Sequence, residues 1–103
     1  MASVVKYEID FAGCVDHHMT FLTARQRATI LDAIERHLIH QPLVKTRNRK
    51  PLDPNDLAPW ELRVGGLRAF YEMSESRPDV VLVLAVGVKV RERLYIAGEE
   101  FPL

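Results

Sequence analysis

The chain contains 103 residues, 48% of them hydrophobic and 27% charged, and its 14 basic side chains balance 14 acidic ones. This size predicts one small globular domain over residues 1–103, and the zero net charge excludes an indiscriminate polycation. Its one cysteine, Cys14, excludes a disulfide framework, and no apolar run resembles a membrane span or a signal peptide. We therefore expect a cytoplasmic protein that makes no membrane contact.

A strand followed by helical segments is predicted for the first forty residues. Apolar side chains alternate along residues 3–11, which indicates a half-buried strand, and residues 16–22 fit a short helical turn. Thr23 and Gln26 have capping-box spacing at the start of a helix over residues 24–40. The expected apolar stripe of this helix comprises Ala24, Ala28, Ile30, Leu31, Ile34 and Leu38.

A basic loop is predicted after this helix. Four prolines and the turn cluster DPND lie between Gln41 and Pro59, so we expect mostly irregular backbone there. Residues 45–50, KTRNRK, hold four basic side chains and no acidic one. So long a loop in a small domain is often functional, although a basic run can also be merely solvated. The candidate phosphate-binding side chains are Lys45, Arg47, Arg49 and Lys50.

Residues 60–72, WELRVGGLRAFYE, are typical of two strands joined by a tight turn. Gly65 and Gly66 favour a primed turn in which both residues have positive φ. The resulting register places Arg63 opposite Arg68 and divides the side chains between two faces. One face is apolar and is expected to join the core: Trp60, Leu62, Val64, Leu67, Ala69 and Tyr71. The other face carries Glu61, Arg63, Arg68, Phe70 and Glu72.

The two facing arginines require an explanation, because like charges directly opposite each other destabilise a sheet. Either Arg63 and Arg68 lie on a solvated face, where Glu61 or Glu72 screens them, or they form an anion site. In an anion site, each guanidinium would present a planar fork to a phosphate. Phe70 on the same face would then be placed to stack on a base.

The apolar run VVLVLAVGVKV, residues 80–90, predicts a strand that is buried on both faces at the centre of the sheet. Its end becomes basic. If the backbone stays extended, four side chains project to one side and converge with Arg63 and Arg68 on a concave surface; they are Lys89, Arg91, Arg93 and Tyr95. The predicted fold is therefore α+β, with a twisted antiparallel sheet of residues 60–64, 67–74 and 80–90 packed against N-terminal helices.

The histidines do not predict a metal site. Cys14, His17 and His18 are close in sequence, and His37 and His40 are three residues apart on a helix. No second cysteine or carboxylate pair completes a recognisable set of ligands, and the helical histidines are explained more simply as cations near a helix C-terminus. We expect neither a metal nor another cofactor.

The order of these elements resembles the RelE/ParE superfamily of bacterial type II toxin–antitoxin toxins. The resemblance covers most of the chain and rests on LRVGGLRAFYEM, residues 62–73, and VLAVGVKVRERLYIAG, residues 83–98. RelE-branch toxins are endoribonucleases that cut messenger RNA in the ribosomal A site with lysines, arginines and a tyrosine. The resemblance implies a cognate antitoxin as partner, metal-independent chemistry and four catalytic residues: Arg68, Lys89, Arg91 and Tyr95. Arg63 and Arg93 belong to the same predicted basic surface and are expected to be further RNA contacts.

Two departures from the RelE pattern keep other functions open. Pro59 and Glu61 stand where RelE enzymes carry lysines, and Lys89 stands where an arginine is expected. For cleavage, Tyr95 or Glu61 would have to carry a proton. The alternatives are a ParE-like toxin, which inhibits DNA gyrase and cleaves nothing, and a degenerate member that binds only antitoxin or RNA. In each case we expect the antitoxin to mask the surface with an amphipathic helix or an acidic tail.

Overall fold

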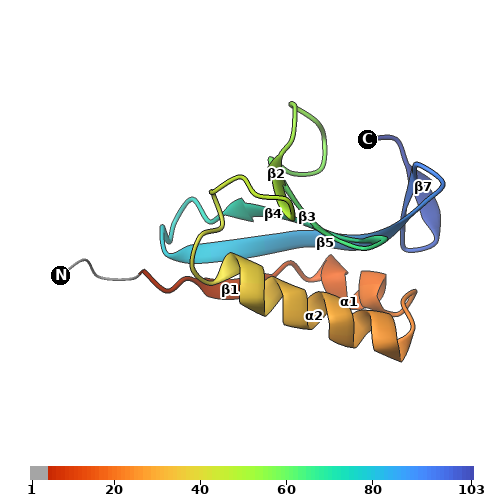
Figure 1. Ribbon diagram of the computed structural model, residues 1–103, viewed down its shortest axis with the longest axis horizontal. Coiled ribbons are helices and arrows are strands. Elements are labelled where there is room, and N and C mark those ends of the chain that lie inside the picture. Colours follow the sequence, from red (N-terminus) through yellow and green to blue (C-terminus); the bar gives the residue numbers. More distant parts are fainter. Residues whose placement is uncertain (1–4) are drawn as a thin grey trace.

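The computed structural model describes residues 5–103, which form an α+β fold with both helices on one side of a seven-stranded sheet (Figure 1). The strands follow the order β2-β3-β4-β5-β6-β7, and β1 pairs with β5 outside that path. The elements are β1 (Glu8–Phe11), α1 (Cys14–Met19), α2 (Ala24–Leu38), β2 (Arg49–Pro51), β3 (Trp60–Val64), β4 (Leu67–Met73), β5 (Val80–Val90), β6 (Arg93–Ile96) and β7 (Glu99–Phe101). The predicted fold class is confirmed; only the β1–β5 pair is parallel.

The N-terminal strand is shorter than predicted. Residues 3 and 4 of the expected strand lie outside the described part of the chain, and regular pairing begins at Glu8. Tyr7 and Ile9 are half-buried, whereas Val5 and Phe11 are exposed. The expected half-burial is therefore found only in the middle of this segment.

β5 is the central strand, as its apolar run predicts. β4 pairs along one edge, and β1 and β6 pair with the two ends of the other edge. α1 lies against the segment between them, where the Cys14 thiol donates to the Leu84 carbonyl (3.3 Å) and the Val86 N–H donates to His18 Nδ1 (3.4 Å). Burial lowers the pKa of His18 and His17 lowers it further, which favours the neutral imidazole that can accept this hydrogen bond.

α2 begins as predicted. The Thr23 hydroxyl accepts from the Gln26 N–H, and the Gln26 side chain accepts from the Thr23 N–H, so the capping box is complete. The buried side of the helix differs in part from the expected stripe, because Ala24, Ala28 and Leu31 are exposed. The side chains that the sheet covers are Ile30, Ala33, Ile34 and Leu38.

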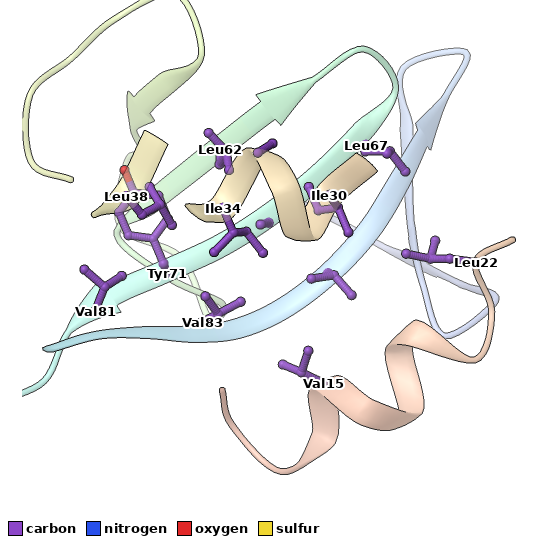
Figure 2. Close-up of a cluster of buried hydrophobic side chains, with 13 residues drawn as sticks. Val15, Leu22, Ile30, Ile34, Leu38, Leu62, Leu67, Tyr71, Val81 and Val83 are labelled. Atoms are coloured by element: carbon purple, nitrogen blue, oxygen red, sulfur yellow. The ribbon is translucent and has the colours of Figure 1, made fainter. Parts of the chain in front are cut away.

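The main core lies between α2 and the apolar face of the β3–β4 hairpin, as predicted. Figure 2 shows Ile30, Ile34 and Leu38 of α2 against Leu62 and Tyr71 of the sheet, and all five are buried. The Tyr71 hydroxyl donates to the Pro42 carbonyl at 2.6 Å, and burial raises the pKa of this phenol. That bond ties the chain leaving α2 to the middle of the sheet.

A second, smaller core covers the opposite face of the sheet. Phe70 is fully buried there with Ala58, Ala85 and Leu94, so the expectation that Phe70 is free to stack on a base is wrong. The loop of residues 52–59 and the β6–β7 ribbon lie over this face, and Figure 1 shows the loop beside β2 on the side away from the helices. The partly buried members are Leu52, Leu57, Leu84, Ile96 and Phe101.

Two local features differ from the sequence expectations. The loop predicted between residues 41 and 59 contains β2, which pairs with β3 and ends at Pro51 on an open edge, where proline is tolerated. In the β3–β4 turn, Gly65 has a φ of 57°, but Gly66 does not have a positive φ. This is the φ pattern of a type II′ turn, which needs positive φ only at its first central residue.

Candidate functional site

Glu61 lies between the two facing arginines. β3 and β4 pair in the predicted register, with Arg63 opposite Arg68. Arg68 Nε is 3.3 Å from Glu61 Oε1, and Arg63 Nε is 4.0 Å from Glu61 Oε2. The carboxylate therefore faces one guanidinium with each of its oxygens, which offsets the repulsion between the two cations.

Arg68 is fixed by the hairpin that carries it. Only 5% of the residue is exposed, and its Nη1 donates to the carbonyls of Gly65 (2.7 Å) and Leu67 (2.8 Å). Its buried Nε–H forms no hydrogen bond with the described residues, because the geometry toward Glu61 is not aligned for one. Burial lowers the pKa of Arg68, Glu61 opposes this effect, and Arg63 adds to it. An arginine nevertheless remains a cation near neutrality, so Arg68 is a fixed buried charge.

Lys89 extends the group from the next strand. Its N–H donates to the Gly66 carbonyl at 2.7 Å, and its side chain is exposed. Because Arg68 pairs with Gly87 and side chains alternate along β5, Lys89 shares the sheet face of Arg68. We call Glu61, Arg63, Arg68 and Lys89 the cation cluster. Glu61 and Lys89 line a pocket of about 130 Å³, together with Glu92, Arg93, Leu94, Glu100, Phe101, Pro102 and Leu103.

The predicted convergence of the remaining basic residues is wrong. The chain reverses at Arg91 and Glu92, which have φ values of 51° and 68°, and β6 returns beside β5. Tyr95 pairs with Val88 and therefore lies on the face that carries the helices, away from the cation cluster. Arg91 occupies the turn itself. Arg93 lies between the two sheet faces, because it lines the pocket of the cation cluster and also a second pocket on the helix side.

The four basic side chains of the loop before β3 differ in how deeply they are buried. Arg49 is 8% exposed, and its Nη1 and Nε donate to the carbonyls of His37 (2.7 Å) and Val44 (2.9 Å). It thus caps the C-terminal end of α2, where a cation is favoured by the helix dipole. Lys50 pairs directly with Glu61 across the β2–β3 ladder and is half-buried. Lys45 and Arg47 are exposed in the loop before β2.

Asn48 contributes to this site, although no sequence pattern distinguishes it from its neighbours. Its side-chain amide donates to the Arg63 carbonyl at 2.8 Å, and its own carbonyl accepts from the Arg63 N–H at 2.7 Å. These bonds hold the end of the basic loop against β3. Neighbouring polar residues in a loop are common, so only the pairing of β2 with β3 could have revealed this role.

Neither a metal site nor a membrane-crossing helix is found in the described part of the chain. No three side chains of His, Cys, Asp or Glu come together there as metal ligands would. Neither α1 nor α2 is long and apolar enough to cross a membrane.

The comparisons with known proteins identify the fold. No protein-family model and no curated protein matches the sequence. Among solved structures, a chain of the toxin–antitoxin complex RelBE2 from Mycobacterium tuberculosis matches with a TM-score of 0.64 and 22% sequence identity. The match covers 82% of this chain and 100% of that chain. The protein therefore has a RelE-like α+β fold, and the resemblance seen in the sequence is confirmed at the level of the fold.

Proposed function

We propose that this protein is the toxin of a bacterial type II toxin–antitoxin system and acts in the cytoplasm as an endoribonuclease on messenger RNA at the ribosome. The RelE-like fold supports the toxin role, because a chain of this fold occurs in the RelBE2 toxin–antitoxin complex. The observation that carries the nuclease role is the cation cluster, in which Arg63 and Arg68 pair with Glu61 and Lys89 lines a pocket with the same glutamate. The partner that follows from this role is a cognate antitoxin.

The cation cluster contains a proton acceptor, a proton donor and a phosphate-binding cation, which a metal-independent cleavage of RNA requires. The ribose 2′-oxygen attacks the adjacent phosphorus while its proton passes to Glu61, and the 5′-oxygen leaves with a proton from Lys89. The products are a 2′,3′-cyclic phosphate and a 5′-hydroxyl. Arg63, which is partly exposed, binds the phosphate oxygens as negative charge develops on them. A preorganised donor of this kind contributes roughly 3–4 kcal/mol in favourable cases.

Arg68 acts in this proposal as a positioning residue. Its buried guanidinium is held by two carbonyls of the hairpin and holds Glu61 in turn. Lys50 lies next to Glu61 across the ladder, and Lys45 and Arg47 continue the positive charge along the loop before it. These three lysine and arginine side chains suit the phosphates that flank the cleaved bond.

One observation favours the alternative of a toxin that inhibits gyrase without cleaving RNA. Tyr95, the tyrosine implied by the RelE resemblance, lies on the opposite sheet face from Arg63 and Arg68. A surface without that tyrosine retains its positive charge and can still bind a protein or a nucleic acid. A degenerate member that binds only antitoxin or RNA has the same support.

Induced expression without an antitoxin separates these functions. We expect growth arrest and new RNA 5′ ends on ribosome-bound messages, with cleavage that is slowed roughly a hundredfold in the Arg63→Ala and Glu61→Gln variants. Arg36→Ala is the matched control, because Arg36 is an exposed arginine of α2 paired with Asp32. Growth arrest with intact RNA and relaxed plasmid DNA would instead establish the gyrase alternative. Normal growth would leave the binding-only alternative.

A further inference from the structure

The helix-side face of the β5–β6 ribbon carries an uncovered apolar surface. Val88 pairs with Tyr95 and Val90 pairs with Arg93, so these four side chains share one face. Val90 is 51% exposed at the end of that face. We call the group formed by Phe21, Val88, Val90, Arg91, Arg93 and Tyr95 the ribbon surface.

Two adjoining pockets make this surface continuous. One of about 540 Å³ is lined by Val90, Arg91, Arg93 and Tyr95. The other, of about 90 Å³, includes Phe21, Leu22, Val88 and Tyr95. Tyr95 belongs to both pockets and joins them, and Phe21 at the far end is 53% exposed. Large exposed apolar side chains grouped in this way are typical of an interaction site.

The ribbon surface carries two arginines that differ in their ionic partners. Arg91 and Arg93 line the larger pocket, and no acidic residue lines it. Glu100, which pairs with Tyr95 across the β6–β7 ladder, lies 3.4 Å from Arg93. Arg91 belongs to none of the ion pairs found among the described residues. A complementary partner must therefore combine apolar side chains for Phe21 and Tyr95 with a carboxylate for Arg91.

We propose that the ribbon surface docks a segment of a partner protein in which apolar side chains are followed by acidic ones. A peptide fits better than RNA, because exposed Phe21 and Val90 offer nothing to phosphates, whereas aromatic and arginine side chains are typical anchors of protein interfaces. The ribbon surface lies on the opposite sheet face from Arg63 and Lys89, where RNA is proposed to bind, and Arg93 borders both surfaces. Only the identification of this partner with the antitoxin rests on the proposed function.

Selection from a displayed library of random 16-residue peptides tests the proposal with the full chain as bait. We expect the bound peptides to combine aromatic or aliphatic residues with Asp or Glu. Arg91→Glu and Val90→Lys should each weaken the binding of a selected peptide, measured by fluorescence anisotropy, by roughly tenfold or more. Arg47→Glu is the matched control, because Arg47 is likewise an exposed arginine and lies in the loop before β2. Both test positions are exposed, so thermal melting of the variants should match the unmodified chain.

Three outcomes would overturn this proposal. One is a set of selected peptides without acidic residues. Another is peptide binding that Arg91→Glu and Val90→Lys leave unchanged. The third is a loss of binding to a 20-nucleotide single-stranded RNA in Arg91→Glu that exceeds the loss in Arg63→Glu, since the ribbon surface would then be a nucleic-acid contact. RNA cleavage is scored separately, so a chain that binds the peptides and cuts no RNA would refute the proposed nuclease and leave the docking surface standing.

Discussion

At the scale of single residues, Glu61 explains why two arginines can face each other on neighbouring strands. Its carboxylate lies within 3.3 Å of Arg68 and 4.0 Å of Arg63, and it is itself largely buried. Repulsion between facing like charges alone predicts that removing Arg68 leaves the free energy of unfolding unchanged or higher. The structure reverses that expectation, because Arg68 is the main partner of a buried carboxylate.

We predict that Arg68→Leu lowers the free energy of unfolding by about 3 kcal/mol, since Glu61 is left buried with only a distant partner. Urea unfolding followed by circular dichroism measures this change. The double variant Glu61→Leu/Arg68→Leu is the control and should recover part of the loss, because it removes both charges together. An Arg68→Leu protein that unfolds at the same urea concentration as the unmodified chain would contradict the buried-pair interpretation.

Tyr71 gives a second prediction at this scale, through its bond to the Pro42 carbonyl. Tyr71→Phe should cost about 1 kcal/mol, the usual contribution of a buried hydrogen bond. Burial raises the pKa of Tyr71, so the folded state holds the phenolic proton more tightly than the unfolded state does. Its contribution is therefore complete below about pH 10 and is lost as the pH rises further. Urea midpoints between pH 8 and 11 should fall less steeply in Tyr71→Phe, and equal slopes would refute the assignment.

At the scale of elements, the close approach of β6 to β5 depends on Gly87. A Cβ added at Gly87 would clash with the Tyr95 carbonyl and lie 3.0 Å from Ile96 Cγ1. We predict that Gly87→Ala costs about 1–3 kcal/mol, as forced overpacking does. Gly66→Ala is the matched control, because its Cβ would meet only the Lys89 carbonyl oxygen at 3.4 Å, an ordinary contact. Similar melting temperatures for the two variants would show that β6 does not pack as described.

The β5–β6 turn offers an opportunity for stabilisation. Glu92 has a φ of 68°, a conformation that glycine adopts without the steric cost of a side chain. We predict that Glu92→Gly raises the free energy of unfolding by roughly 0.5–1 kcal/mol. Glu35→Gly on the exposed side of α2 should lower it by about 1 kcal/mol, which serves as the opposite control. A destabilised Glu92→Gly protein would mean that the turn is not left-handed at this residue.

At the scale of the whole molecule, local signals predicted both helices, β5 and the β3–β4 hairpin with its register, but not β2, β6 or β7. Gly65-Gly66 and strict alternation specify that register, and the Thr23 capping box specifies the start of α2. The β5–β6 reversal could not be predicted, because arginine and glutamate are not among the residue types that usually form such turns. The continuous strand expected there placed Tyr95 on the wrong face.

Long-range packing explains the remaining differences between sequence and structure. Arg49 was selected for its charge, but its burial depends on the carbonyl of His37, which only the tertiary fold brings near. The loop at 52–59 covers Phe70 for the same kind of reason, since nothing local indicates which face a loop will lie on. The cation cluster was therefore predictable in part: the facing arginines follow from alternation, whereas the bridging position of Glu61 follows from packing.

The pairing of β1 with β5 also sets the order in which the chain can fold during its own synthesis. Glu8 lies beside Val80, so the first strand has no neighbour until the ribosome has made the central one. Until then, the β3–β4 hairpin against which α2 packs lacks its neighbouring central strand, and Lys89 has not yet joined the arginines of the hairpin. Contacts this distant along the chain form late and slowly. A nascent chain that stops before β5 thus lacks both the partner strand of β1 and one member of the cation cluster.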